Sequence, residues 1–384
     1  MRAMIEVADV PGANWPQVEQ SANINKWQLR TLGAIRRCRT AALGSHIDGC
    51  TSCGHVRISY NSCRNRHCPK CQGAEKEKWI AAREAELLPV PYFHVVFTLP
   101  NTLNPLCLHQ PAVMYNILFG SIWATVNSFG KDAKWLGAQT GMISILHTWG
   151  QTMGLHPHLH CIVPGSGLTK QRNWRTAKSE GKYLFNVKLM GTVFRGRFIA
   201  ELKKQLPADI TPALLTSLYK QPWVVFAKLP FANPRSVIEY LGRYTHKIAI
   251  SNYRLKKHEN SKVDFTYKDY KHGSVTKTMQ LDDMEFIRRF SLHILPRCFI
   301  RIRHCGILSS SCKGTCAELI NAQLPPIKTP AYIKLKQKRP PFDPKQCPCC
   351  KQATMKTLLQ FKNRLRPWYW EQLAKELLEM EQPA

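Results

Sequence analysis

The stretch from residue 155 to residue 163 reads Leu-His-Pro-His-Leu-His-Cys-Ile-Val. Its alternation matches the two-residue period of a β-strand, so His158 and His160 share one face while Leu159 points into a core. Two imidazoles side by side on a rigid strand form a ready pair of metal ligands. A His-Leu-His triplet also occurs where the histidines are only partly buried, so the surroundings decide between these interpretations.

A second predicted strand, at residues 142–149, precedes this one and carries His147. A hairpin between the two strands would bring His147 across from His158 and His160. The three imidazoles would then form a metal site with open positions for water or phosphate. Gln151 and His156 are alternative candidates for the third ligand.

The rest of the chain between residues 92 and 305 predicts a mixture of strands and helices. Because most strands are separated by helices or long loops, the pattern indicates an α+β fold built on a sheet. The further predicted strands are residues 92–99, 223–229 and 247–252, and the predicted helices are residues 112–126, 189–205, 234–245 and 282–295.

The predicted helix at residues 234–245 carries Tyr240 and Tyr244, which stand four residues apart and therefore share one helix face. Arg243 and Lys247 lie close by. Two such aromatic side chains can simply cover the edge of a core. A phenol can also act as a nucleophile on phosphorus when a metal polarises the phosphate and a cation lowers the phenol's pKa.

Two cysteine pairs with two-residue spacing lie near the N-terminus, separated by the 14 residues 54–67. This spacing predicts a zinc ribbon with four cysteine ligands, Cys50, Cys53, Cys68 and Cys71. Arginines among these ligands are suited to gripping phosphates, so Arg57, Arg64 and Arg66 are candidate DNA-binding residues together with Arg243 and Lys247.

Further cysteines and histidines occur in or near the same segment. Cys63 and His67 could join His46 and Cys38 on a second zinc ion, or replace a member of the first set; they could equally be ordinary surface or packing residues. Near the C-terminus, Cys347 and Cys350 form another pair, for which Cys312 and Cys316 could supply the second half of a zinc site. The tail at residues 361–370 interleaves basic and aromatic residues that could track a DNA strand, or pack as a helix on the zinc module.

The charge of the chain indicates its partner. Lys and Arg number 55 against 25 for Asp and Glu, a formal net charge of +30. Such an excess favours nucleic acid as partner, because each neutralised phosphate releases counterions. A basic protein without this partner, or one attracted to an anionic membrane surface, is the alternative.

The compartment follows from what the sequence lacks. No apolar run is long enough to predict a transmembrane helix, and the charged N-terminal residues do not resemble a signal peptide. We therefore expect a cytoplasmic, nucleoid-associated protein with no membrane partner. In that reducing environment its 15 cysteines argue for metal sites and against disulfides.

Three motifs occur together and in a fixed order: Cys50 to Cys71, His158-Leu-His160 and Tyr240-x-x-x-Tyr244. The combination resembles the two-tyrosine rolling-circle insertion-sequence transposases of the HUH endonuclease superfamily. The flanking sequence is similar as well, and the resemblance covers residues 25–310.

The resemblance implies an HUH-type antiparallel sheet flanked by helices, with the zinc ribbon before it; the C-terminal zinc module is a prediction from the spacing of the later cysteines alone. It implies that His158 and His160 hold Mg or Mn, with His147 as the preferred third ligand, although other branches of the superfamily use Gln or Glu. One tyrosine would attack the scissile phosphate and form a 5′-phosphotyrosine. The second would allow a second cleavage.

The implied partners are single-stranded or hairpin DNA at transposon ends, target DNA and the host replication machinery. The expected domains are an N-terminal helical segment (1–45), a zinc-binding domain (46–90), the tyrosine nuclease (91–310) and a C-terminal Cys-containing basic region (311–384). Two rival functions remain: a plasmid relaxase or replication initiator with the same chemistry, and a zinc-dependent DNA-binding regulator without catalysis.

Overall fold

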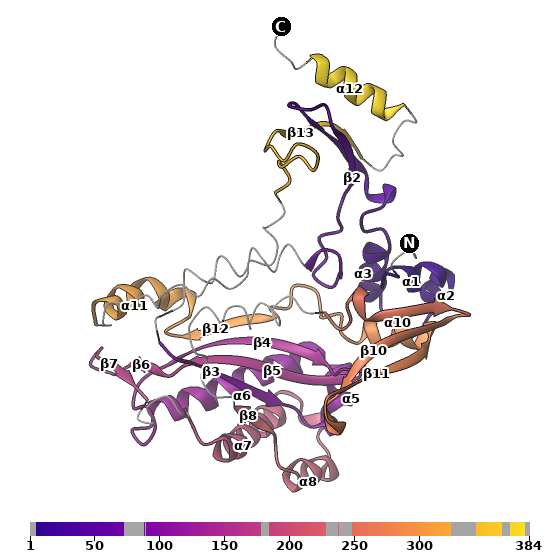
Figure 1. The fold of residues 1–384 in the computed structure, drawn as a ribbon. Coiled ribbons are helices and arrows are strands. Elements are labelled where there is room, and N and C mark those ends of the chain that lie inside the picture. The colour runs from indigo at the N-terminus through magenta and orange to yellow at the C-terminus, as the bar shows by residue number, and fades with distance from the viewer. Residues whose placement is uncertain are drawn as a thin grey trace.

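The computed structural model describes residues 5–72, 88, 90–177, 184–227, 237, 248–323, 343–362 and 369–380. At its centre is a five-stranded antiparallel sheet in the order β12-β4-β5-β3-β8 (Figure 1). Its strands are β3 (Tyr92–Thr98), β4 (Gly141–Trp149), β5 (Leu155–Pro164), β8 (Val225–Ala227) and β12 (Ile302–Gly306). The α+β architecture predicted from the sequence is therefore confirmed.

One face of this sheet is covered by helices. Side chains of β3, β4 and β5, among them Phe97, Leu146 and Leu159, share a large buried core with residues of two long helices. The helices on this side of the sheet are α5 (Asn104–His109), α6 (Pro111–Lys131), α7 (Val187–Gln205) and α8 (Pro212–Lys220) (Figure 1). Helix α6 begins with a proline at its first position, where no intrahelical donor is lost.

The opposite face of the sheet carries the histidines. Residues directly opposite one another in antiparallel strands share a face, and β4 and β5 pair His147 with His158 and Ile145 with His160. Farther along the same face, Ile143 and Ile162 form a smaller buried cluster. This face is thus polar at one end and apolar at the other.

A three-stranded meander that the sequence analysis did not predict packs with the N-terminal helices. It consists of β9 (Leu255–Glu259), β10 (Lys262–Asp269) and β11 (Val275–Asp282), and leads into α10 (Asp283–Ser291). Phe265 and Phe286 form a buried core there with Leu32 of the N-terminal region. The N-terminal helices are α1 (Asp9–Ala13), α2 (Trp15–Gln20) and α3 (Lys26–Arg36), and the other small elements are β6 (Ser166–Leu168), β7 (Trp174–Thr176) and α11 (Ser310–Gln323).

The two ends of the chain meet in one small sheet. Its order is β13-β1-β2, with β1 (Ser45–Cys50) and β2 (Val56–Tyr60) from the N-terminal part and β13 (Met355–Phe361) from the C-terminal part. Helix α12 (Trp370–Met380) packs on it through Trp370, which is buried with Ile47. The prediction of a separate C-terminal region from residue 311 onward is therefore corrected. Within residues 343–380, the described β13 and α12 pack with β1 and β2 of the N-terminal part.

Most predicted elements of the central sheet are found, with shifted ends. The strand predicted at residues 247–252 is not one, since residues 248–252 have no strand pairing and begin a short 3-10 turn. The helix predicted at residues 234–245 lies outside the described residues, apart from Val237. None of the helices in the described ranges is long and apolar enough to cross a lipid bilayer.

Candidate active site and cysteine clusters

The hairpin of β4 and β5 brings His147, His158 and His160 together. Their ring centroids are 5.4 Å apart for His147 and His158, 4.5 Å for His147 and His160, and 5.0 Å for His158 and His160. One ring nitrogen of each lies within 4.8 Å of the other two. Three neutral imidazoles at this spacing can share one divalent ion. Of the alternative third ligands, His156 is not part of this group, and the side-chain oxygen of Gln151 lies 3.5 Å from the backbone amide of Lys268.

Hydrogen bonds orient two of these rings. His158 Nδ1 lies 2.6 Å from the backbone carbonyl oxygen of His156, to which it donates. His160 Nδ1 shares a 2.9 Å hydrogen bond with Nε2 of His94, whose ring stacks on that of His160. A histidine whose Nδ1 is engaged in this way binds metals through Nε2. His94 is fully buried on β3. The sequence analysis did not identify it, because its contact with His160 depends on the pairing of β3 with β5.

A cationic and aromatic layer borders the histidines at the end of β4. The Trp149 ring stacks on His147 with centroids 4.7 Å apart, and the guanidinium of Arg301 lies 5.2 Å from the Trp149 ring centre. Arg301 also donates to the carbonyl oxygen of Leu146 at 3.1 Å. Burial, together with the nearby charge of Arg66, lowers the pKa of Arg301 to about 9. Arg301 still carries a proton at neutral pH, so the site has a positive neighbour.

The two tyrosines of the third motif, Tyr240 and Tyr244, lie outside the described residues, as do Arg243 and Lys247. The nearest described residue before them is Val237. Val237 is fully buried in the cluster that contains Ile143 and Ile145, on the histidine face of the sheet.

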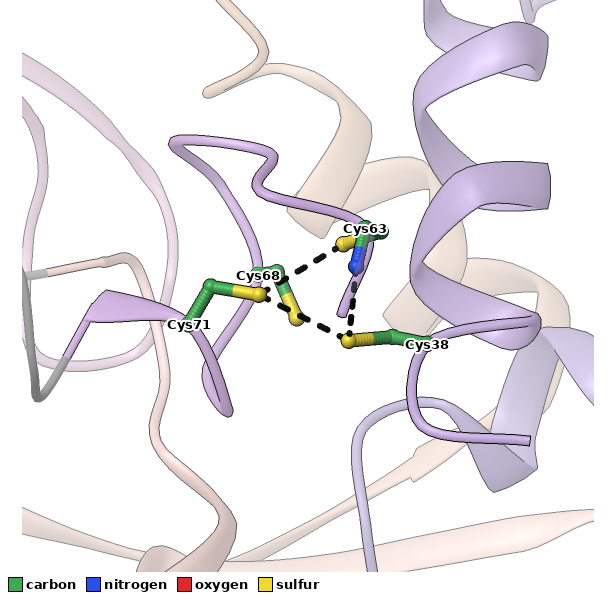
Figure 2. A group of neighbouring side chains, drawn as sticks. All are labelled: Cys38, Cys63, Cys68 and Cys71. Atoms are coloured by element: carbon green, nitrogen blue, oxygen red, sulfur yellow. Dashed lines mark hydrogen bonds between the residues drawn. The ribbon is translucent and has the colours of Figure 1, made fainter. Parts of the chain in front are cut away.

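The N-terminal cysteines form a group that differs from the predicted one. Cys38, Cys63, Cys68 and Cys71 converge (Figure 2), with sulfurs 3.6 Å apart for Cys38 and Cys71 and 3.7 Å for Cys63 and Cys71. A tetrahedral zinc with Zn–S bonds of about 2.3 Å places its sulfurs roughly 3.8 Å apart. The donor set and its spacing therefore fit a structural zinc ion.

The predicted set of Cys50, Cys53, Cys68 and Cys71 is corrected, because the structure does not bring its two pairs together. The five-residue strand β2 runs between them, and at about 3.3 Å per residue it spans roughly 17 Å. Cys50 and Cys53 lie instead with Cys347 and Cys350, all four sulfurs within 4.8 Å of one another. Cys312 and Cys316, predicted to join Cys347 and Cys350, are on α11 and outside this group.

The histidines predicted for a second zinc site are also placed elsewhere. Cys63 joins the first cysteine group, but neither His46 nor His67 belongs to either described group. His46 lies 3.7 Å from Asp48 and 3.3 Å from Asn61. His67 is buried, and this burial lowers its pKa to about 3, which keeps the ring neutral.

The three N-terminal arginines differ in their surroundings. Arg57 pairs with Asp48 at 3.3 Å and donates to the carbonyl oxygen of Pro344 at 3.1 Å. Arg66 donates to the carbonyl oxygens of Phe299 and Pro296 at 2.6 and 2.9 Å. Each of these two guanidinium groups therefore links the N-terminal part of the chain to a segment distant in sequence. Arg64 is exposed.

Comparisons with known proteins place the chain in a family. Residues 12–99 match the profile described as "Transposase zinc-binding domain", of the IS91 type, and residues 141–315 match the profile described as "Putative transposase". A protein of Sinorhizobium fredii named "Putative transposase y4qJ" is 40% identical over 362 residues, covering 88% of this chain and 91% of that protein. The chain belongs to the IS91-type transposase family.

Two other proteins are similar to this transposase. The transposase for insertion sequence element IS801 of Pseudomonas savastanoi pv. phaseolicola is 28% identical over 314 residues, covering 78% of this chain and 75% of its own. Among solved structures, the metal-free complex of the conjugative relaxase TrwC with OriT DNA aligns with a TM-score of 0.25 and 10% identity, over 40% of this chain and 71% of TrwC. The three histidines lie within the transposase match, and Cys38 to Cys71 lie within the zinc-binding match.

Proposed function

We propose that this transposase nicks and joins single-stranded DNA at the ends of its element through a 5′-phosphotyrosine intermediate. The observation that carries the proposal is the group of His147, His158 and His160, with ring nitrogens within 4.8 Å of one another. Mg²⁺ or Mn²⁺ held there would polarise the scissile phosphate. Membership of a transposase family supports DNA as the substrate. The net charge of +30 is suited to binding such a polyanion.

The anchors on both sides of the tyrosine segment support Tyr240 and Tyr244 as nucleophiles. Val237, three residues before Tyr240, is buried with Ile143 and Ile145 of β4. Ile248, four residues after Tyr244, lines a small pocket with Thr148 and Trp149 at the end of the same strand. Val237 and Ile248, the described residues that flank the segment, therefore both lie near the strand that carries His147.

The chemistry assigned to these residues is an exchange of phosphodiester bonds. The phenol of one tyrosine gives up its proton as its oxygen attacks phosphorus in line, and the bond between phosphorus and the 3′ oxygen breaks. The 3′ oxygen takes up a proton and leaves as a hydroxyl that can prime replication by the host machinery. The phosphotyrosine ester conserves the bond energy, so a DNA hydroxyl can later displace the tyrosine. The second tyrosine makes a second cleavage, which exchanges donor and target strands.

Positive side chains near the tyrosines and on the zinc module complete the proposal. Arg243 and Lys247 would contact the phosphate or the phenolate, as cations do in phosphoryl transfer. On the zinc module, the exposed Arg64 is the candidate for gripping backbone phosphates of a single-stranded or hairpin element end. Arg57 and Arg66 are less suited to that role than Arg64, because their guanidinium groups already donate to backbone carbonyl oxygens.

Covalent trapping tests the function. The purified transposase is incubated with Mn²⁺ or Mg²⁺ and labelled single-stranded DNA that covers the flanks of its gene, and the products are separated on a denaturing gel. A shifted band that requires the metal and disappears with EDTA is expected. Tight DNA binding with no adduct on any flank would contradict the proposal and favour a non-catalytic regulator.

His94 offers a second test, through the metal site alone. Replacing His94 by Phe removes the hydrogen bond to His160 Nδ1 and is expected to weaken Mn²⁺ binding by about 10- to 100-fold, as losses of such supporting contacts do. Isothermal titration calorimetry measures the affinity. His94→Gln retains an amide near the position of Nε2 and is expected to recover most of it. Equal affinities for the wild type and His94→Phe would show that His94 does not position His160.

A further inference from the structure

We propose that Cys50, Cys53, Cys347 and Cys350 hold a second structural zinc ion, whose ligands come in equal number from the two ends of the chain. The four sulfurs lie within 4.8 Å of one another. Neither family match assigns this site, since residues 12–99 and 141–315 both stop short of Cys347. It is separate from the site that Cys38, Cys63, Cys68 and Cys71 form.

The two cysteine pairs have the same local backbone, that of a zinc knuckle. After Cys53, Gly54 adopts a positive φ of 68°, and after Cys350, Lys351 adopts a φ of 65°. The amide of each of these residues donates to the carbonyl oxygen of the first cysteine of its pair, at 3.0 Å in both cases. A non-glycine residue rarely adopts a positive φ. We therefore attribute this conformation at Lys351 to the geometry of a turn that points both cysteine sulfurs at one ion.

A second hydrogen bond repeats in both knuckles. The amide of Cys50 donates to the carbonyl oxygen of His55 at 2.9 Å, and the amide of Cys347 donates to that of Gln352 at 2.8 Å. Each turn is thus closed on both sides of its cysteine pair. Two equivalent knuckles that face each other supply four thiolates to one point, which is how tetrahedral zinc is bound.

The sulfur distances agree with a metal and exclude disulfides. Cys50 and Cys350 are 3.6 Å apart, and Cys53 and Cys347 are 3.7 Å apart. These values approach the roughly 3.8 Å expected for sulfurs around zinc, and they far exceed the S–S bond of about 2.05 Å. The Thr354 hydroxyl lies 3.1 Å from Cys50 Sγ, and the Cys349 amide donates to Cys347 Sγ at 3.4 Å. Such contacts stabilise metal-bound thiolates.

The surrounding sheet holds the two knuckles opposite each other. Strands β1 and β13 pair so that Cys50 lies across from Met355. Beside them, the buried Asp48 accepts a 2.9 Å hydrogen bond from Thr357 and pairs with Arg57, which also contacts Pro344. The C-terminal segment is therefore attached by strand pairing, a buried charge and apolar packing as well as by the cysteines.

This site makes the zinc module discontinuous in sequence. The catalytic sheet is inserted between the two halves of the module, so the second zinc can be bound only after the C-terminal residues have been synthesised. A chain that ends before residue 343 keeps Cys38, Cys63, Cys68 and Cys71 but lacks two ligands of the second site and strand β13.

Zinc content of the full chain tests the proposal. With His158→Ala present in every chain tested, so that the three-histidine site takes up no zinc, the protein with all its cysteines is expected to hold two zinc ions per chain by plasma mass spectrometry, and the Cys347→Ser, Cys350→Ser double variant one. The matched control is Cys349→Ser, in the same knuckle but outside the group, which is expected to keep both ions. The Cys312→Ser, Cys316→Ser variant is also expected to keep both. Two ions in the Cys347, Cys350 variant, or a loss in the Cys312, Cys316 variant, would overturn the assignment.

A ligand exchange keeps the test decisive if the double variant does not fold. Cys347→His retains four ligands, so two metals are still expected, but one thiolate is replaced by an imidazole. With Co²⁺ in place of zinc, the thiolate-to-cobalt absorption per chain should fall by about one eighth, one of eight sulfurs, and the visible bands should shift to shorter wavelength. A cobalt spectrum identical to that of the wild type would show that Cys347 is not a ligand.

Discussion

The Tyr240→Phe, Tyr244→Phe double variant is expected to form no covalent DNA adduct and to lose strand cleavage by on the order of 10,000-fold or more. The reason is that phenylalanine keeps the ring and removes only the phenolic oxygen, the one atom that bonds to phosphorus in the proposed reaction. Adduct formation is measured on denaturing gels with labelled single-stranded DNA and Mn²⁺. DNA affinity, measured by fluorescence anisotropy, should change little.

The single variants separate the two tyrosines. If each makes one cleavage, Tyr240→Phe and Tyr244→Phe should each retain one adduct-forming step and fail to complete strand exchange. Tyr253→Phe is the matched control, because Tyr253 is a nearby exposed tyrosine outside the motif, and it should behave as the wild type. An adduct that persists in the double variant would assign the nucleophile to another residue.

Loss of a histidine from the proposed metal site is the second large effect. His158→Ala and His160→Ala are each expected to slow cleavage by roughly 1,000-fold, since a metal ion stabilises transition-state charge by several kcal/mol. Single-turnover cleavage rates measured across a Mn²⁺ titration would show this loss. Partial recovery at high Mn²⁺ concentration is expected if the remaining imidazoles still bind the ion weakly.

The same titration identifies the third ligand. His147→Ala should resemble His158→Ala, because its ring nitrogen lies within 4.8 Å of those of the other two histidines. His156→Ala is the control, since His156 does not belong to that group, and Gln151→Ala tests the alternative amide ligand. A larger loss in Gln151→Ala or His156→Ala than in His147→Ala would reassign the ligand.

The sequence contained enough to predict the histidine hairpin. The strands predicted at residues 92–99 and 142–149 are found at Tyr92–Thr98 and Gly141–Trp149. Their apolar periodicity is local, and a short link between neighbouring strands leaves few ways to pair them. The pairing of His147 with His158 follows from that hairpin.

The meander of β9, β10 and β11 was not predicted, because its pattern is weak. Strand β11 exposes most of its residues, with polar side chains on both faces, so the two-residue alternation is indistinct. Its partner β10 buries only Val263 and Phe265. These strands are held by pairing with each other and by packing against the N-terminal helices, and neither can be deduced from a local window.

The sequence by itself determined the α+β class, a charge that favours a nucleic-acid partner, and the presence of cysteine pairs with the spacing of zinc knuckles. Only the tertiary structure decided how these pairs combine. A two-residue spacing fixes which two sulfurs share an ion but says nothing about the other two ligands. The length of β2 separates Cys53 from Cys68, and the pairing of β1 with β13 brings Cys350 to Cys50. Pairing between strands some 300 residues apart depends on the whole fold, because no local pattern records it.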